Sequence, residues 1–283
     1  MNNYIEEINQ IKEKILSCDA VIIGAGAGLS TSAGLYYSGE RFEENFKDFI
    51  EEYNLTDMYS SAFRFFSFEN PTRRWAYWSR HVKLNRYDKL DSDTYKNLLD
   101  LVKDKNYFVL TTNADHLFIR NGFDKERIFY TQGDYGLFQC SKACHNKTYD
   151  NHDIIMKMCK KQKNMDIPKE LIPYCPKCGS YMDMNLRADD RFVEDDGWNE
   201  ACNRYEKFIN DNKDKNIVYL ELGVGYNTPG IIKYPFMRYT YQNKKATYIN
   251  INYNQASTID EIKDRSILIN NDIDEVLKFI KNN

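Results

Sequence analysis

The sequence predicts an α/β fold in which helices cover both faces of a doubly wound parallel sheet of six strands. Three observations lead to this prediction. Six short apolar runs, rich in β-branched and aromatic residues, alternate with segments of helical spacing. Each run ends at Gly, Asn, Thr or Asp, and ligands of open α/β sheets bind beyond the carboxyl ends of the strands. The first run passes through closely spaced glycines into a helical segment, which indicates a strand, a tight turn and a helix.

The sheet is predicted to begin after an amphipathic helix at 4–17, in which isoleucines recur at helical spacing. The first strand, Ala20–Ala25, is apolar and runs into glycines at positions 24, 26 and 28. Glycines let the backbone approach a ligand closely, and a helix N-terminus offers free N–H groups and the positive end of the helix dipole. The ligand expected at such a turn is a phosphate group. The spacing does not complete a G-x-G-x-x-G fingerprint, so a plain strand–helix turn is the alternative.

Residues 40–100 are rich in aromatic side chains at helical spacing, with an interruption at Pro71. We interpret this segment as a helical insertion that covers the sheet, with a helix at 42–53, and its aromatic side chains as a packing core. An aromatic cofactor-binding box is the alternative interpretation. A further helix, at 95–103, precedes the second strand.

The remaining strands follow in order, and polar or turn residues follow each of them. They are predicted at 106–112, 128–130, 217–222, 246–251 and 266–269, before a short helix at 272–281. The residues that follow them include Thr111, Thr112, Asn113, Ala114, Asp115, His116, Thr131–Asp134, Gly223–Asn227 and Asn252. Turn residues also end strands where no ligand binds. As a set at one edge of a sheet, however, these residues favour a nucleotide-sized site.

Two cysteine pairs between the third and fourth strands predict a structural zinc site. The four residues are Cys140, Cys144, Cys175 and Cys178. The second pair has the Cys-Pro-Lys-Cys-Gly form of a zinc knuckle, and four thiolates leave no open position for catalysis by the metal. His145 and Cys159 are alternative ligands, and free buried thiols are the alternative to a metal site. A polar helix and loop are expected at 150–172, and a charge-dense solvated loop at 184–198.

Composition argues against several classes of partner. The net charge of −3 provides no basic field for nucleic acid. The first ten residues are polar and acidic, unlike a signal peptide, and no apolar run approaches the roughly 18 residues that span a membrane. We therefore expect a cytoplasmic protein without a membrane partner, whose seven cysteines do not form a disulfide framework.

Together these motifs resemble those of the sirtuins over nearly the whole chain. Residues 26–35 are similar to the family's NAD-binding motif, and Thr111–Asp115 to its Thr-Gln-Asn-x-Asp segment. Gly223–Gly225 falls at the family's Gly-Thr/Ser-Ser turn, Ile251-Asn252 at its adenosine-facing pair, and Asn271–Asp274 at its final adenine-side turn. The cysteines fall where the family has its zinc ribbon.

The resemblance implies NAD as co-substrate, structural Zn²⁺ and the sirtuin arrangement of domains. A Rossmann-like domain would comprise 1–37, 104–135 and 190–283, with a helical insertion at 38–103 and a zinc-binding small domain at 136–189. The cofactor-binding residues it implies are Gly26, Ala27, Gly28, Ser30, Gly34, Leu35, Tyr36, Arg41, Thr112, Asn113, Asp115, Gln132, Gly223, Val224, Gly225, Asn252 and Ile273. The catalytic residues are expected to be Asn113, Asp115 and Gln132, and the acceptor-gripping residue Arg187.

Three departures from the sirtuin pattern indicate a subfamily. Sirtuins have a general-base His before a Gly, where this chain has Gln132-Gly133. Their Phe-Gly-Glu substrate loop is replaced by Asn185–Asp190, and their Pro-x-Phe-Arg by Tyr36–Gly39. These changes, and the run Gln132–Cys140, resemble the macrodomain-linked (class M) bacterial sirtuins. That resemblance implies ADP-ribose transfer to a protein, with a lipoylated glycine-cleavage-H-like carrier as acceptor and a macrodomain hydrolase as partner.

The glutamine also has a direct chemical meaning. Deacylation needs a base that takes a proton from a ribose hydroxyl, and a Gln amide has no usable basicity. Losing a general base costs about 10²–10⁴ in rate, so efficient deacylation is not expected. ADP-ribosyl transfer to a nucleophile on the acceptor survives the change. A weak deacylase, an NAD glycohydrolase and a non-enzymatic NAD or ADP-ribose sensor are the alternatives.

Overall fold

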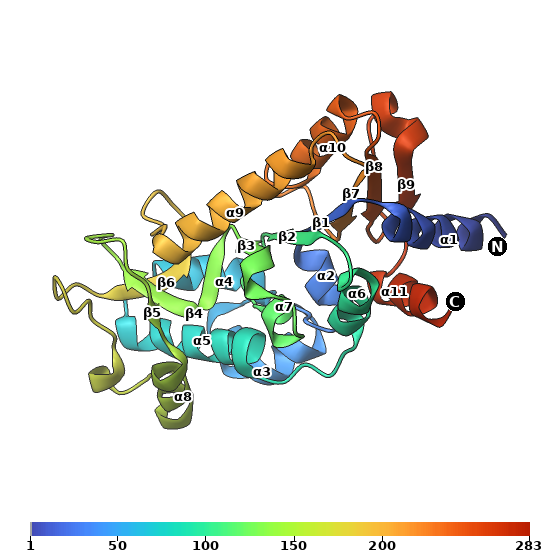
Figure 1. The fold of residues 1–283 in the computed structure, drawn as a ribbon. Coiled ribbons are helices and arrows are strands. Elements are labelled where there is room, and N and C mark those ends of the chain that lie inside the picture. Colours follow the sequence, from blue (N-terminus) through green and yellow to red (C-terminus); the bar gives the residue numbers. More distant parts are fainter. Residues whose placement is uncertain (1) are drawn as a thin grey trace. The chain divides into compact units, whose positions relative to one another are not determined.

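A computed structural model describes residues 2–283, which form two compact units (Figure 1). The first unit comprises the chain up to Gly34, Asp91–Thr131 and Gly197–Asn283. The second comprises Leu35–Leu90 and Gln132–Asp196, so the aromatic-rich segment and the cysteine-containing segment share one unit. The domain boundaries given above stay a prediction, and each unit is described by itself.

The first unit is built on a sheet of six parallel strands in the order β3-β2-β1-β7-β8-β9. The strands are β1 (Ala20–Ala25), β2 (Tyr107–Thr111), β3 (Ile128–Tyr130), β7 (Ile217–Leu222), β8 (Thr247–Ile251) and β9 (Ser266–Ile269). The chain builds outward from β1 to β3 and then returns to the other side of β1 with β7. The order therefore reverses between β1 and β7, and the carboxyl ends of these strands are where such sheets bind ligands.

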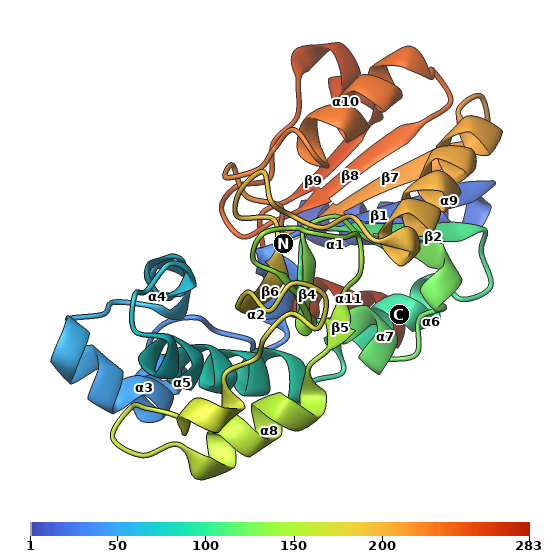
Figure 2. The ribbon, with the colours of Figure 1, turned by 90° about the vertical axis from the view of Figure 1, so that its left-hand side faces the viewer.

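Helices cover the sheet as the doubly wound fold requires, which confirms the predicted fold class. They are α1 (Asn2–Ser17), α2 (Ala27–Ser32), α6 (Thr94–Val102), α7 (Leu117–Arg120), α9 (Asp196–Asn212), α10 (Lys233–Gln242) and α11 (Ile273–Asn282), with short 3₁₀ turns at Lys125–Arg127 and Asp260–Arg265. Figure 2 shows α9 and α10 across one face, where Ile209 and Phe236 pack against strand residues such as Ile22. On the other side, α11 packs with α1, α2 and α6.

A buried ion pair joins the sheet to α10. The Lys233 ammonium contacts the Glu221 carboxylate, and the two side chains are at most 1% exposed. The Tyr248 hydroxyl donates to the second Glu221 oxygen at 2.6 Å. Burial raises the pKa of Glu221, and its two partners act in the opposite direction. Within residues 2–283, no helix is long and apolar enough to cross a membrane.

The second unit combines helices with a three-stranded antiparallel sheet of order β5-β4-β6. Its helices are α3 (Glu40–Tyr53), α4 (Met58–Phe66), α5 (Pro71–Val82), the π-helical turn η1 (Lys83–Tyr87), α8 (His152–Lys161) and the 3₁₀ turn Lys169–Leu171. Its strands are β4 (Gly133–Cys140), β5 (Tyr149–Asp150) and β6 (Met182–Leu186). Pro71 interrupts the helical pattern as predicted, because it begins α5 where a missing N–H costs nothing and Asn70 caps the helix.

One loop prediction is wrong at both ends. Residues 184–198 are predicted to be a solvated loop, but Met184–Leu186 complete β6, with Met184 and Asn185 buried, and residues 196–198 form the first turn of α9. The polar Asn185 is accommodated because its side-chain amide donates to Gln139 Oε1 at 2.8 Å and to the Val193 carbonyl at 3.1 Å. A buried polar side chain is tolerated when it is hydrogen-bonded in this way.

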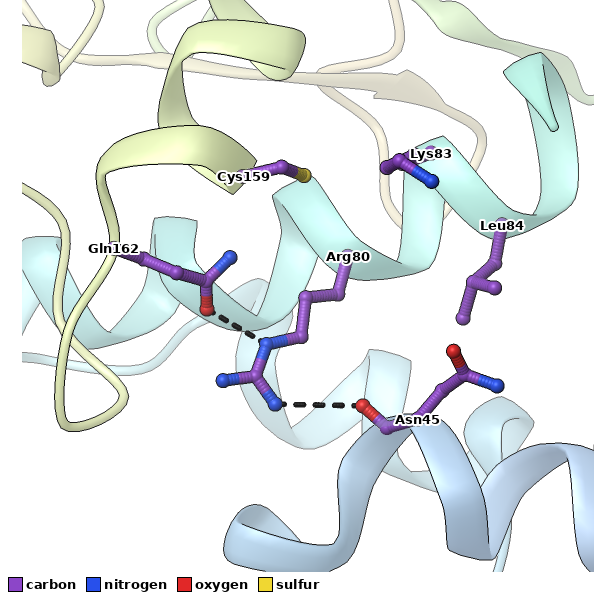
Figure 3. Close-up of a pocket in the computed structure, with 6 residues that line it drawn as sticks. All are labelled: Asn45, Arg80, Lys83, Leu84, Cys159 and Gln162. Carbon is purple, nitrogen blue, oxygen red and sulfur yellow. Dashed lines mark hydrogen bonds between the residues drawn. The ribbon is translucent and has the colours of Figure 1, made fainter.

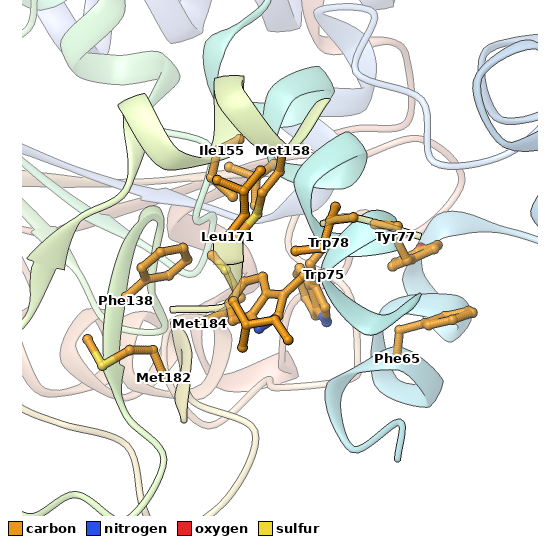
Figure 4. Packing of buried hydrophobic residues seen from close by; sticks show 14 of the residues in the cluster. Phe65, Trp75, Tyr77, Trp78, Phe138, Ile155, Met158, Leu171, Met182 and Met184 are labelled. Carbon is orange, nitrogen blue, oxygen red and sulfur yellow. The ribbon is translucent and has the colours of Figure 1, made fainter. Parts of the chain in front are cut away.

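The aromatic residues of the second unit form its core, which confirms the packing interpretation (Figure 4). Phe49, Phe65 and Tyr77 stack or meet edge to face, with ring centroids 4.4–5.7 Å apart. Tyr59 and Phe63 of α4 are exceptions, because both are more than half exposed. The core also contains His81, which is fully buried and has no hydrogen-bond partner for either ring nitrogen among the described residues.

Candidate active site and metal centre

Glycines bring the turn after β1 and the turn after β7 into direct backbone contact. The Gly28 N–H donates to the Gly223 carbonyl at 2.9 Å, and a Cβ at Gly28 would lie 2.7 Å from Gly223 Cα. A Cβ at Gly26 would lie 2.6 Å from the same carbonyl oxygen. Gly24, which belongs to strand β1, instead allows close packing of the sheet on the α10 region, because a Cβ there would collide with Ile232 and Phe236. The predicted glycine motif therefore holds two adjacent strand ends together at the topological switch.

A buried polar network lies at the carboxyl ends of β1 and β2. The Ser30 hydroxyl donates to Asp115 Oδ2 at 2.6 Å, and the Asn113 amide donates to Ser30 Oγ at 3.1 Å and to the Gly26 carbonyl at 2.9 Å. Burial raises the pKa of Asp115, while the hydrogen bonds from Ser30 and from the Leu117 N–H act against it. The structure thus brings together three predicted site residues from two strand ends.

Tyr95 belongs to this network and was not predicted. Its hydroxyl lies 3.0 Å from Ser30 Oγ, and the side chain is 1% exposed. The sequence contains one signal for it: Tyr95 shares the buried face of α6 with Leu98 and Val102, and a buried phenol normally finds a hydrogen-bond partner. The identity of that partner, Ser30, could not be predicted, because the two residues are 65 positions apart in the sequence.

The other predicted residues of the first unit line the same edge of the sheet. The Asn252 amide donates to the Val224 carbonyl at 3.0 Å, which links the ends of β7 and β8. Ile273 begins α11, whose cap residue Asp272 accepts a hydrogen bond from Ser32 at 2.9 Å. Gly34, Thr112 and Gly225 lie in turns that follow α2, β2 and β7. His116 stacks on Tyr130 with ring centroids 4.0 Å apart.

Leu35, Tyr36 and Arg41 lie in the second unit. Leu35 is buried and Tyr36 is half exposed. The Arg41 guanidinium donates to the carbonyls of Tyr36 and Leu84 and to Asn85 Oδ1, at 2.8–3.0 Å. Arg41 therefore fastens the chain that follows the glycine motif to η1.

Gln132 and Arg187 are brought together although 55 positions separate them. The Arg187 N–H donates to the Gln132 carbonyl at 3.1 Å, where β4 and β6 pair. Gly133 permits this approach, because its φ is +95° and a Cβ there would collide with the Asn185 carbonyl. The Arg187 guanidinium lies 4.3 Å from the Phe192 ring centroid and pairs with Glu194 at 2.6 Å.

The four predicted metal ligands converge in the second unit. Their sulfur atoms lie within 4.8 Å of one another, with Cys140 and Cys178 3.5 Å apart and Cys144 and Cys175 3.7 Å apart. Tetrahedral zinc with bonds of about 2.3 Å needs sulfur atoms about 3.8 Å apart, so the cluster fits a closed structural zinc site. The ring of the alternative ligand His145 lies beside the cluster: Nδ1 is 3.0 Å from Cys144 Sγ, and Nε2 is 2.7 Å from the Tyr149 hydroxyl. The four cysteines alone form the group of converging ligand atoms among the described residues.

The other candidate ligand, Cys159, lines a separate pocket of about 330 Å³ in the second unit (Figure 3). The lining residues are Asn45, Arg80, Lys83, Leu84, Cys159 and Gln162, none of which is a predicted site residue. Asp48 pairs with Arg80, and Asp88 with Lys83, so the pocket carries no uncompensated charge from these cations.

No protein-family model matches the chain. It is 39% identical over 278 residues, 98% of this chain and 88% of the relative, to a Staphylococcus aureus (strain Mu50) protein named protein ADP-ribosyltransferase. It is 35% identical over 241 residues, 79% of this chain, to a Fusarium oxysporum f. sp. cubense protein named "Probable bifunctional ADP-ribose hydrolase/ADP-ribosyltransferase". The match spans 38% of that second relative.

Solved structures of Sir2 proteins share the fold. A Sir2 homologue in complex with NAD matches with a TM-score of 0.61 at 16% identity, over 97% of this chain and 94% of the other. Sir2Tm bound to a propionylated peptide matches with a TM-score of 0.58 at 16% identity, over 97% of each chain. The order of the six-stranded sheet and the cysteine cluster agree with this fold, and the Staphylococcus aureus relative matches 98% of this chain. The chain belongs to the protein ADP-ribosyltransferase family and is built on the sirtuin fold.

Proposed function

We propose that this protein is an NAD-dependent protein mono-ADP-ribosyltransferase that modifies a lipoylated glycine-cleavage-H-like carrier. The observation that carries the proposal is the combination of the Ser30–Asn113–Asp115 network with a glutamine at position 132, in a chain of this family. The network supplies groups for cleaving the nicotinamide–ribose bond. The glutamine lacks the basicity that deacylation demands.

In this proposal the first unit holds most of NAD. The residues that would contact it there are Gly26, Ala27, Gly28, Ser30, Gly34, Thr112, Asn113, Asp115, Gly223, Val224, Gly225, Asn252 and Ile273. The backbone N–H groups and short polar side chains of these residues suit a dinucleotide, because they lie in turns at the carboxyl ends of five parallel strands. The resemblance to sirtuins also assigns NAD binding to Leu35, Tyr36, Arg41 and Gln132, which lie in the second unit.

Cleavage of the nicotinamide–ribose bond develops positive charge on the ribose. A negative Asp115 carboxylate, held by Ser30 and the Leu117 N–H, stabilises that charge, and Asn113 orients the ribose. The Gln132 amide orients a ribose hydroxyl without taking its proton. Nicotinamide leaves with the electron pair of the broken bond, a nucleophile of the acceptor forms the new bond to ribose C1′, and the proton of that nucleophile passes to solvent.

The acceptor half of the proposal involves Arg187. Its guanidinium is stacked on Phe192 and its side chain is 37% exposed, so a cation is held at the surface directly after β6. Its backbone N–H donates to the Gln132 carbonyl, so the backbones of the proposed acceptor-gripping residue and of the proposed catalytic residue are adjacent. The Fusarium relative, whose name joins a hydrolase to a transferase, supports a macrodomain hydrolase as the partner that removes the modification.

Label transfer from NAD tests the proposal. The protein is incubated with NAD labelled in the adenylate and with the carrier in lipoylated and unlipoylated forms, and the carrier is analysed by intact mass. Wild type should add one ADP-ribose to the lipoylated carrier, and Asn113→Ala should reduce this at least 100-fold. Gln242→Ala, an exposed amide at the end of α10, is the matched control and should not change it.

The other outcomes identify the alternatives. Deacylation of acyl-lysine peptides without label transfer would make the protein a deacylase. Free ADP-ribose without a modified acceptor would make it a glycohydrolase. An NAD pool unchanged over hours would make it a sensor.

A further inference from the structure

We infer that Tyr95 is a positioning residue for the reaction proposed above: its hydroxyl fixes Ser30 so that Ser30 holds Asp115 and Asn113 in place. The inference rests on the proposed function. It concerns a residue that does not itself touch the reacting atoms, and it follows from counting the protons in the network.

Ser30 has one proton to donate and two lone pairs that accept. Asp115 as a carboxylate only accepts, so at 2.6 Å it takes the Ser30 proton. The Asn113 amide nitrogen only donates, so it fills one Ser30 lone pair at 3.1 Å. The remaining contact, 3.0 Å to Tyr95, must therefore run from the phenol to Ser30 Oγ. All three hydrogen-bonding positions of Ser30 are then used.

This arrangement keeps the Ser30 hydroxyl on Asp115. Donation from Tyr95 polarises the Ser30 hydroxyl and strengthens the bond that it gives to the carboxylate. Without the phenol, one Ser30 lone pair lacks its donor in a buried site, and the bond that Ser30 gives to Asp115 loses this polarisation. Burial raises the pKa of Asp115, whereas the hydrogen bonds from Ser30 and the Leu117 N–H and the electrostatic effects of His116 and Arg120 lower it.

The position of Tyr95 suits a fixed part of the site. Its ring packs edge to face on Phe118 with centroids 4.9 Å apart, so its hydroxyl is held by a rigid core contact. The preceding residue, Thr94, donates to Asp274 Oδ1 at 2.7 Å, in the first turn of α11. Successive residues of α6 thus contact α2 and α11, which carry Ser30 and Ile273.

Tyr95→Phe removes the hydroxyl and keeps the ring. We expect kcat for NAD cleavage to fall about 10-fold, the effect of losing one hydrogen bond that orients a reacting group, with KM for NAD changed less than about 2-fold. The acid limb of the pH–rate profile should move to higher pH, because a weaker bond from Ser30 stabilises the Asp115 carboxylate less. Tyr107→Phe is the matched control: it removes the hydroxyl of another buried tyrosine, one that accepts from the Asp124 N–H at 3.3 Å, and should leave both readouts unchanged.

The double variant Ser30→Ala/Tyr95→Phe decides whether Tyr95 acts through Ser30. If it does, the double variant is no slower than Ser30→Ala alone. The inference is refuted if the fold-losses of the two single variants multiply in the double variant, or if Tyr95→Phe keeps the wild-type kcat and pH profile. In either case, an active wild-type protein leaves the proposed function standing. A wild-type protein that cleaves no NAD overturns both. Urea denaturation of each variant separates loss of rate from loss of folded protein.

Discussion

Replacing His81 with phenylalanine should abolish a pH-dependent loss of stability in the second unit. His81 is 0% exposed on α5, and its ring lies among Tyr37, Tyr77, Trp78 and Tyr135 with centroid distances of 5.0–6.1 Å. Neither ring nitrogen has a partner among the described residues. A proton added to this ring would place a charge in an apolar core, so folding disfavours the protonated form.

The magnitude follows from the pKa of the two states. Burial, with a smaller effect from the Arg41 cation, lowers the pKa of His81 from 6.5 to about 3 in the folded protein. In the unfolded chain the imidazole has its ordinary pKa. Between these values the unfolded chain binds one more proton, so the free energy of unfolding decreases as pH falls, by about 1.36 kcal/mol per pH unit. Integration from pH 7 to pH 4.5 gives a loss of about 2.5 kcal/mol from this residue alone.

Urea titrations at pH 7 and pH 4.5, followed by tryptophan fluorescence, measure the effect. Trp75 and Trp78 belong to the second unit and Trp198 to the first, so the signal reports mainly on the unit that contains His81. Between the two pH values, His81→Phe should lose about 2.5 kcal/mol less than wild type, and any constant packing cost of phenylalanine cancels in this difference. His152→Phe, at a half-exposed histidine of the same unit, should match wild type. Equal losses in wild type and His81→Phe would refute the reasoning.

Three further predictions concern the backbone contact, the buried ion pair and the metal centre. Gly28→Ala should cost about 1–3 kcal/mol of unfolding free energy in urea, because its Cβ meets backbone that cannot move aside, whereas Gly225→Ala, with nothing within 4 Å, should cost under about 0.5 kcal/mol. Lys233→Met should cost about 3–5 kcal/mol by leaving the Glu221 carboxylate buried without its cation, and adding Glu221→Gln should recover most of that loss. Metal analysis of the purified protein should find one zinc ion per chain, and Cys178→Ser should lower both the zinc content and the urea midpoint of the second unit.

The parts of the fold that could be predicted are those whose signal is local. The four central strands β1, β2, β7 and β8 are buried along their length, so each is a run of mostly apolar residues that stands out in the sequence. Helix α9 was not predicted, because only Ala201, Ile209 and Asn212 of its 17 residues are buried and its apolar stripe is faint. Residues 184–186 of β6 are assigned to a loop because the stretch that they begin is dense in charge, and β6 itself contains the polar Asp183 and Asn185. Both are buried by partners, Arg74 and Gln139, that lie far away in the sequence.

The candidate site shows the same division. Asn113 and Asp115 lie in a short motif directly after a strand, so their place at the sheet edge follows from the sequence. Tyr95 reaches the network only through the packing of α6, which no local pattern reveals. The hydrogen bond between Arg187 and Gln132 likewise depends on the pairing of β4 with β6.

Loss of the metal would expose the four thiols of the cysteine cluster to oxidation. Pairs of its sulfur atoms lie only 3.5 and 3.7 Å apart, so a small movement brings either pair to the bond length of a disulfide. Without the ion, dissolved oxygen can take two electrons and two protons from such a pair and lock the ribbon covalently. Zinc then acts as a protecting group for four thiols. Preparations that combine a chelator with air should therefore accumulate a species that zinc alone cannot restore and that a thiol reductant with zinc can.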